Sequence, residues 1–168
     1  GFGKEIVVTH FRDGRIQVED FGRGCPVDWN EKVGKYNWEL VFCELYAGGK
    51  YDNNGGDNYE YSLGLNGLGA CATQYTARFM DVIVRRDGKR YDLHFEKGQL
   101  IGEMKVSPAD WKKTGTTITW LPDLEVFTQT DIPDEYFKDV LHRQAVVNAG
   151  ITFRFKTQAE PGFDETTY

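Results

Sequence analysis

Two hairpin signals constrain the fold of this chain more than any other feature of its sequence. Residues 5–19 contain two β-rich segments on either side of a turn at Gly14, and residues 80–95 repeat this arrangement around Asp87 and Gly88. A hairpin pairs consecutive strands in opposite directions. The sequence therefore predicts a largely antiparallel sheet.

Three helices are predicted between the strands. Residues 38–46 place four apolar side chains on one helical face, residues 70–79 open a helix from a glycine-rich turn, and Pro133 opens a third helix that ends near Gly150. Further strands are predicted at residues 115–121 and 151–155. This order favours the α+β class: a two-layer α/β sandwich with helices on one face of a mixed, mostly antiparallel sheet.

The length and composition fit a single globular domain. The chain has 168 residues, of which 40% are hydrophobic, enough to bury a core. We expect the domain to span residues 1–156 and residues 157–168 to form a C-terminal tail or linker. The 20 basic and 26 acidic residues give a net charge of −6. This charge disfavours a direct contact with DNA.

Cysteine and histidine positions bear on metal binding and location. The three cysteines include no CxxC pair, and the three histidines lie far apart in the sequence, which disfavours a structural metal site and suits reduced thiols. No run approaches the roughly 20 apolar residues of a membrane span. We therefore expect a soluble, cytoplasmic protein with no membrane contact.

The first candidate binding motif is DFGRGCP at residues 20–26, which directly follows a predicted strand. Asp20 could accept a hydrogen bond from an exocyclic amine, while Gly22 and Gly24 would let a ligand ring approach the backbone. The alternative is an aspartate that only caps a turn. The motif by itself is compatible with both interpretations.

The second motif is GLNGLG at residues 64–69, at the start of a predicted helix. Free amides and the helix dipole at such a position favour an anion such as a phosphate. A tight loop-to-helix turn is the alternative. The GxxGxG spacing matches neither a Walker A loop nor a Rossmann fingerprint. Before this motif, residues 50–61 are polar and rich in turn formers, which is typical of a mobile loop.

The two motifs in this order resemble the GHKL ATPases, in particular the B subunits of type IIA DNA topoisomerases (gyrase and topoisomerase IV). The resemblance covers residues 4–156. It rests on the following segments: 4–9 (KEIVVT), 18–26 (VEDFGRGCP), 46–51 (YAGGKY), 65–69 (LNGLG), 86–88 (RDG), 113–116 (KTGT) and 124–127 (LEVF).

The resemblance implies a role for each matched residue. Asp20 would bind the adenine amino group, Gly22 and Gly24 would let the base pack closely, and Thr116 would join a water-bridged contact with adenine. The amides of residues 65–69 would face the phosphates of ATP, and residues 50–61 would form the ATP lid. The implied phosphate-binding residues are Leu65, Asn66, Gly67, Leu68 and Gly69; the implied pocket edge, where ATP-competitive inhibitors of the family bind, would comprise Arg23, Cys25, Pro26 and Arg86. Solvated or ion-paired surface positions are the alternative for the two arginines.

The sequence also departs from the family pattern. Leu63 stands in place of a glycine and Asn66 in place of a histidine in the second motif, which puts the geometry of the lid in doubt. Phe21 replaces an Asn or Asp, and Cys25 replaces an Ile, so this side of the pocket should be more apolar.

In the family, a helix before the first matched strand carries a Mg²⁺-binding Asn and a general-base Glu. The resemblance places both residues upstream of Gly1, so we expect no catalytic or metal residue in the chain and no ATP hydrolysis by the chain alone. The parent protein would couple ATP hydrolysis to DNA strand passage. Its partners would be DNA, an A subunit and a second B subunit that is clasped by an N-terminal arm.

Two alternative functions stay open at this stage. One is another GHKL ATPase of the mismatch-repair, chaperone or histidine-kinase type, although residues 46–50 and 113–116 favour the topoisomerases. The other is a non-catalytic interaction module in which the glycine turns only shape the fold.

Overall fold

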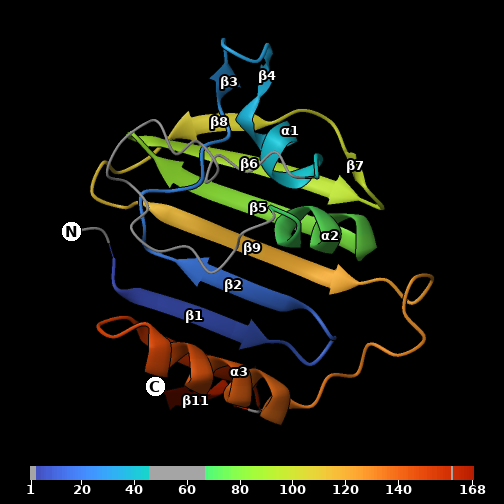
Figure 1. Ribbon diagram of the computed structural model, residues 1–168, viewed down its shortest axis with the longest axis vertical. Coiled ribbons are helices and arrows are strands. Elements are labelled where there is room, and N and C mark those ends of the chain that lie inside the picture. The colour runs from blue at the N-terminus through green and yellow to red at the C-terminus, as the bar shows by residue number, and fades with distance from the viewer. Residues whose placement is uncertain (1–2, 46–66, 160) are drawn as a thin grey trace.

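The computed structural model describes residues 3–45, 67–159 and 161–168, and a nine-stranded sheet dominates it (Figure 1). The strands of this sheet are β1 (Glu5–His10), β2 (Ile16–Asp20), β5 (Ala77–Arg86), β6 (Lys89–Glu96), β7 (Gln99–Leu100), β8 (Lys105–Pro108), β9 (Gly115–Pro122), β10 (Thr152–Gln158) and β11 (Phe163–Thr167). They follow the order β11-β10-β1-β2-β9-β5-β6-β7, and β8 also pairs with β6.

Both predicted hairpins are confirmed. β1 pairs antiparallel with β2, and β5 pairs antiparallel with β6 along its length. The turn of the second hairpin has positive φ angles at Asp87 and Gly88, 52° and 69°. Asp and Gly tolerate these angles, which give the turn a twist that matches the flanking strands.

One strand pairing is parallel and joins the two ends of the described chain. β1 lies parallel to β10, with Ile6 opposite Phe153. β10 then pairs antiparallel with β11. The segment that we expected to be a tail or linker contains regular structure: Thr157 still lies in β10, and residues 163–167 form the outer strand of the sheet. That it leads to a further domain stays a prediction. Sheet pairing and an ion-pair contact between Arg154 and Glu165 hold this polar segment.

Three helices lie on one face of the sheet (Figure 1): α1 (Asn37–Phe42), α2 (Gly69–Thr76) and α3 (Asp134–Val147). The helix predicted at residues 70–79 is shorter than expected. It ends at Thr76 because Ala77 already pairs with Pro122 of β9, so the sheet takes the residues that follow. Pro133 is the N-cap of α3, directly before its first residue Asp134, with a φ of −61° that the proline ring fixes.

The core lies between these helices and the sheet. Phe42 of α1 packs with Met80, Val82 and Phe95, while α3 covers a second cluster around Phe155. Trp120 of β9 contacts both clusters, so the two parts of the core share one sheet face. The predicted two-layer α+β architecture is confirmed.

Four short strands were not predicted. β7 and β8 extend one side of the main sheet, and β3 (Trp29–Asn30) and β4 (Lys35–Tyr36) form a separate hairpin that projects beyond it (Figure 1). Segments of two to four residues are too short for a periodic pattern. In the described ranges, no helix has the length and apolarity that a membrane span needs.

Candidate functional site

The end of β2 and the start of β9 meet on the helix-covered side of the sheet, and this corner contains Asp20 and Thr116. Asp20 Oδ1 accepts hydrogen bonds from the backbone N–H of Gly22 at 2.8 Å and of Thr116 at 3.4 Å. Oδ2 accepts no hydrogen bond from any residue that the structure describes. The carboxylate therefore does cap a turn, as one interpretation held, and its second oxygen has no hydrogen-bond partner among the described residues.

Two glycines bring the backbone segments of this corner into close contact. Gly24 has a φ of +86°, and a Cβ there would lie 2.6 Å from the carbonyl oxygen of Arg85. Gly115 has a φ of +141°, and its Cβ would lie 2.1 Å from the carbonyl oxygen of Asp20. Neither position can accept a side chain without movement of the backbone.

Gly115 lies in the same corner, and sequence reasoning did not single it out. Its position between two threonines at the start of a predicted strand was visible, but a strand interior gives no reason to require glycine. The reason is the backbone of Asp20, which passes against Gly115 from a strand far away in the sequence.

Thr116 connects the corner to the rest of the first motif. Its side chain is buried, and its Oγ1 accepts a hydrogen bond of 2.9 Å from the backbone N–H of Cys25. The Cys25 thiol is half-buried and donates to the carbonyl of Pro26 at 3.5 Å. Cys25 also packs against the core cluster that contains Val27. The wall on this side of the corner is therefore partly apolar.

The two candidate arginines differ in how they are held. Arg86 Nη1 donates to the carbonyl oxygen of Gly24 at 3.0 Å, and its Nε contacts Asp87 at 3.2 Å. The structure thus brings Arg86 to the glycine motif across 62 positions of sequence. Arg23 is exposed.

The described part of the second motif forms the start of α2. Leu68 is the N-cap and makes no side-chain capping bond, and the backbone N–H of Ala72 donates to the Leu68 carbonyl at 2.8 Å. The first amides of a helix have no partner within it. Leu65 and Asn66, like residues 50–61 of the expected lid, lie outside the described residues.

The first turn of α2 is directed toward the Asp20 corner. In Figure 1, α2 runs across the sheet away from the end where β2 finishes and β9 begins. Its N-terminal end therefore lies toward that end of the sheet, on the helix-covered side.

The residues just before β1 run beside the first motif. The backbone N–H of Gly3 donates to the carbonyl oxygen of Phe21 at 2.8 Å. Gly1 and Phe2 lie outside the described residues. The Mg²⁺-binding Asn and the general-base Glu, which the resemblance places upstream of Gly1, therefore stay a prediction.

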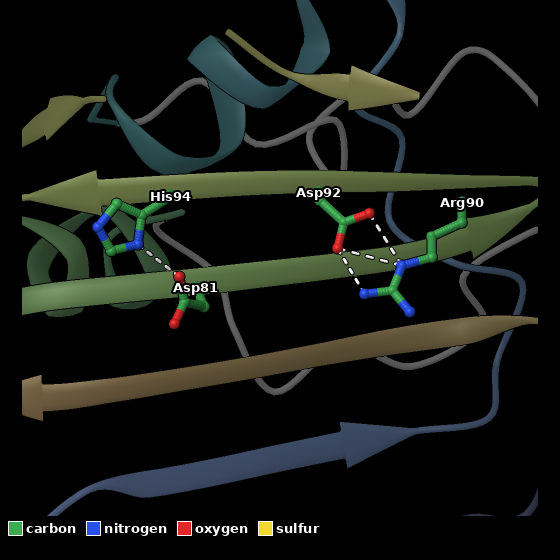
Figure 2. A network of polar contacts seen from close by, with 4 residues as sticks. All are labelled: Asp81, Arg90, Asp92 and His94. Atoms are coloured by element: carbon green, nitrogen blue, oxygen red, sulfur yellow. Dashed lines mark hydrogen bonds and ion pairs between the residues drawn. The ribbon is translucent and has the colours of Figure 1, made fainter. Parts of the chain in front are cut away.

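A second polar cluster lies on the opposite face of the sheet, and sequence reasoning missed it. Asp81 Oδ1 lies 2.5 Å from His94 Nδ1, and Arg90 binds Asp92 through both Nε and Nη2 (Figure 2). Hydrogen bonds to Asp81 and then to Glu96 raise the pKa of His94. A hollow of about 460 Å³ adjoins this cluster. No group of three or more metal-ligating side chains occurs among the described residues.

No protein-family model matches the chain. The chain is similar to the B subunit of the type 2 topoisomerase of Aquifex aeolicus, with 37% identity over 153 residues, 91% of this chain and 19% of that protein. It is 34% identical over 169 residues to the DNA gyrase B subunit of Streptococcus pneumoniae, which covers 100% of this chain and 25% of that protein. The chain thus spans about a fifth to a quarter of the length of these curated relatives.

Two solved structures share the fold. One is the 43K ATPase domain of Thermus thermophilus gyrase B in complex with an aminocoumarin, with a TM-score of 0.79, 27% identity and coverage of 100% of this chain and 40% of that one. The other is the topoisomerase IV ATP-binding domain of Francisella tularensis in complex with a small-molecule inhibitor. It has a TM-score of 0.80 at 24% identity, covering 100% of this chain and 76% of that one.

Proposed function

The chain belongs to the family of type II topoisomerase B subunits, and we propose that it is the part of such a protein that binds ATP. The observation that carries this proposal is the Asp20 corner. There, backbone amides hold one carboxylate oxygen and leave the other for a ligand, beside two glycines that admit no side chain.

The donors and acceptors of the site fit adenine and phosphate. Asp20 Oδ2 would accept a hydrogen bond from the exocyclic amine of adenine, and the hydroxyl of Thr116 would take part in the same contact, directly or through water. Gly22 and Gly24 would let the base pack against the backbone. Arg23, Cys25, Pro26 and Arg86 would line the outer edge of the pocket.

The phosphates would bind at the other end of the site. Amides at the start of α2, from Gly67 to Gly69, would donate to phosphate oxygens, which the helix dipole also favours. We extend this assignment to Leu65 and Asn66 on the sequence alone. Mg²⁺ would accompany the phosphates and neutralise their charge. The proposal assigns it no ligand within the chain and keeps the general-base Glu and the Mg²⁺-binding Asn upstream of Gly1.

For the whole protein, we propose the activity that the relatives' names indicate, a change of DNA topology driven by ATP. This proposal includes DNA, an A subunit and a second B subunit as partners. The charge of −6 disfavours a DNA contact within this region, so the proposal assigns that contact to other parts of the protein. A cytoplasmic location goes with the proposal, because bacterial chromosomes lie there.

A thermal melt with nucleotides tests the ATP-binding proposal. ATP at a hundred times its dissociation constant should add about 2.7 kcal/mol to the free energy of unfolding. GTP is the matched control, because guanine presents a carbonyl oxygen where adenine presents an amine, and two acceptors do not bond. We expect ATP to raise the melting temperature and GTP to leave it nearly unchanged.

Each other outcome of the melt has a definite meaning. No protection by millimolar ATP would contradict the proposal and favour a non-catalytic interaction module. Equal protection by ATP and GTP would leave nucleotide binding in place but remove Asp20 as the group that selects the base.

A further inference from the structure

Helix α2 is held in place by very few side chains. It has eight residues, of which only Cys71 and Gln74 are buried, each 1% exposed. A helix this short has little stability of its own, so its position depends on its tertiary contacts. Of these two buried residues, Gln74 is the one with a polar amide side chain.

The amide of Gln74 joins α2 to two other elements. Its Nε2 donates to the carbonyl oxygen of Phe42, the last residue of α1, at 3.3 Å, and to that of Gly98, in the turn between β6 and β7, at 3.4 Å. The same nitrogen lies 3.6 Å from the Cys43 sulfur. Oε1 is buried, with no hydrogen-bond partner in the described part of the chain. A buried amide with one end unsatisfied is costly, so the contribution of the Gln74 side chain to the position of α2 comes from its donor end.

The neighbouring Tyr75 contacts the same two elements. Its hydroxyl donates to the carbonyl oxygen of Cys43 at 3.4 Å, and its ring lies so close to Gly98 that a Cβ there would be 2.8 Å away. Gly98 has a φ of +88°, which also favours glycine. Gln74 and Tyr75 therefore fix the C-terminal half of α2 against α1 and the sheet.

We propose that Gln74 is a positioning residue for the phosphate end of the ligand. Because α2 has only eight residues, a displacement at Gln74 would also move its first turn, where the amides of Gly69, Ala70 and Cys71 have no partner within the helix. Asp20 lies on β2, and none of the described hydrogen bonds joins it to Gln74 or Tyr75. Binding of the base should therefore not depend on Gln74. The inference rests on the proposed ATP-binding function and refines it.

The test compares two ligands in the full-length protein. One is the non-hydrolysable β,γ-imido analogue of ATP, measured by calorimetry, and the other is adenosine, measured by its displacement of a fluorescent ATP analogue. Gln74→Leu keeps the side-chain size but removes the donor. We expect it to weaken the affinity for the triphosphate analogue about tenfold, the equivalent of one or two hydrogen bonds, and to change the affinity for adenosine less than twofold.

Further variants separate positioning from loss of folding. Gln74→Asn keeps an amide but is one carbon shorter, so it cannot reach Phe42 and Gly98 together. It should lose less affinity for the triphosphate analogue than Gln74→Leu, and its affinity for adenosine should again change little. This variant decides the matter if Gln74→Leu does not fold. Ala72→Ser, at an exposed position of the same helix, should bind both ligands like the unsubstituted protein.

The outcomes distinguish this inference from the proposal on which it rests. If the unsubstituted protein binds neither ligand, the ATP-binding proposal fails. If it binds both ligands but the Gln74 variants do not change the ratio of the two affinities, Gln74 is a structural residue and the inference is overturned. An equal loss of affinity for both ligands has the same meaning.

Discussion

Asp20 and Asp81 are carboxylates on the same sheet, but they stand on opposite faces and in opposite chemical situations. Asp20 lies on the helix-covered face, and backbone amides alone hold its Oδ1. Asp81 lies on the other face, where His94 contacts it at 2.5 Å in a row of paired charges (Figure 2). Asp20 Oδ2 has no hydrogen-bond partner among the described residues, whereas Asp81 is already hydrogen-bonded to a titratable side chain, that of His94.

The difference shows how each face should respond to substitution. The Asp20 corner is built from backbone groups and glycines in close contact, so a change of backbone shape should disturb it strongly. The opposite face is built from long, partly exposed side chains. Each of its ion pairs is screened by water and contributes little to stability.

The largest effect that we expect is the loss of stability in Gly115→Ala. The new Cβ would meet the carbonyl oxygen of Asp20, at a φ that alanine rarely adopts, and the cost should be about 3 kcal/mol of unfolding free energy. Urea denaturation measures it. Gly102→Ala is the control: Gly102 also has a positive φ, +74°, but open space around its Cβ, so we expect about 1 kcal/mol. Equal losses would mean that the close contact with Asp20 does not matter.

The second effect concerns ligand binding. Asp20→Ala should weaken ATP binding by about 1–3 kcal/mol, because a hydrogen bond to the base is lost, and should leave the fold intact. Asp81→Ala removes the same carboxylate from the opposite face and should leave the affinity unchanged. Calorimetric titration of both variants decides the comparison. A similar loss in both would place the ligand, or the source of the effect, elsewhere.

The smallest effect is a dependence of stability on pH that comes from His94. Its pKa is raised above the ordinary value of 6.5, first by the hydrogen bond to Asp81 and then by the one to Glu96. A raised pKa means that the stabilisation is fully present below pH 6.5 and is lost as the pH rises through the folded-state value. All three side chains are more than a third exposed, so we expect only about 0.5 kcal/mol.

Comparison of the unfolding free energies of the unsubstituted chain and His94→Gln near pH 5.5 and pH 8.5 measures this effect. The two should differ at the lower pH and converge at the higher one. His142→Gln, at an exposed histidine that stacks on Tyr168, is the control. A gap that widens with rising pH would have the wrong sign and would contradict the assigned pairing.

The sequence predicted those parts of the fold that local patterns determine. Alternation and turn residues located both hairpins, and Pro133 located the start of α3. Long-range pairing decided what the sequence did not show. The end of α2 depends on the pairing of Ala77 with Pro122, and β11 depends on β10 beside it.

The candidate site divides in the same way. Asp20, Gly24 and Thr116 were predicted from the motifs, and the structure brings all three together. Gly115 and Gln74 were not predicted, because their importance comes from neighbours far away in the sequence. The lid at residues 50–61 stays a prediction outside the described residues.

The parallel pairing of β1 with β10 has a consequence for how the protein is made. Ile6 can meet Phe153 only after the residues between them, 7–152, have left the ribosome. Pairings between such distant segments carry a large loop-closure entropy and slow the folding reaction. Until then β1 presents an unpaired edge to other chains in the cell. Slow translation of residues 100–150 should therefore prolong the period in which the nascent chain needs protection by chaperones.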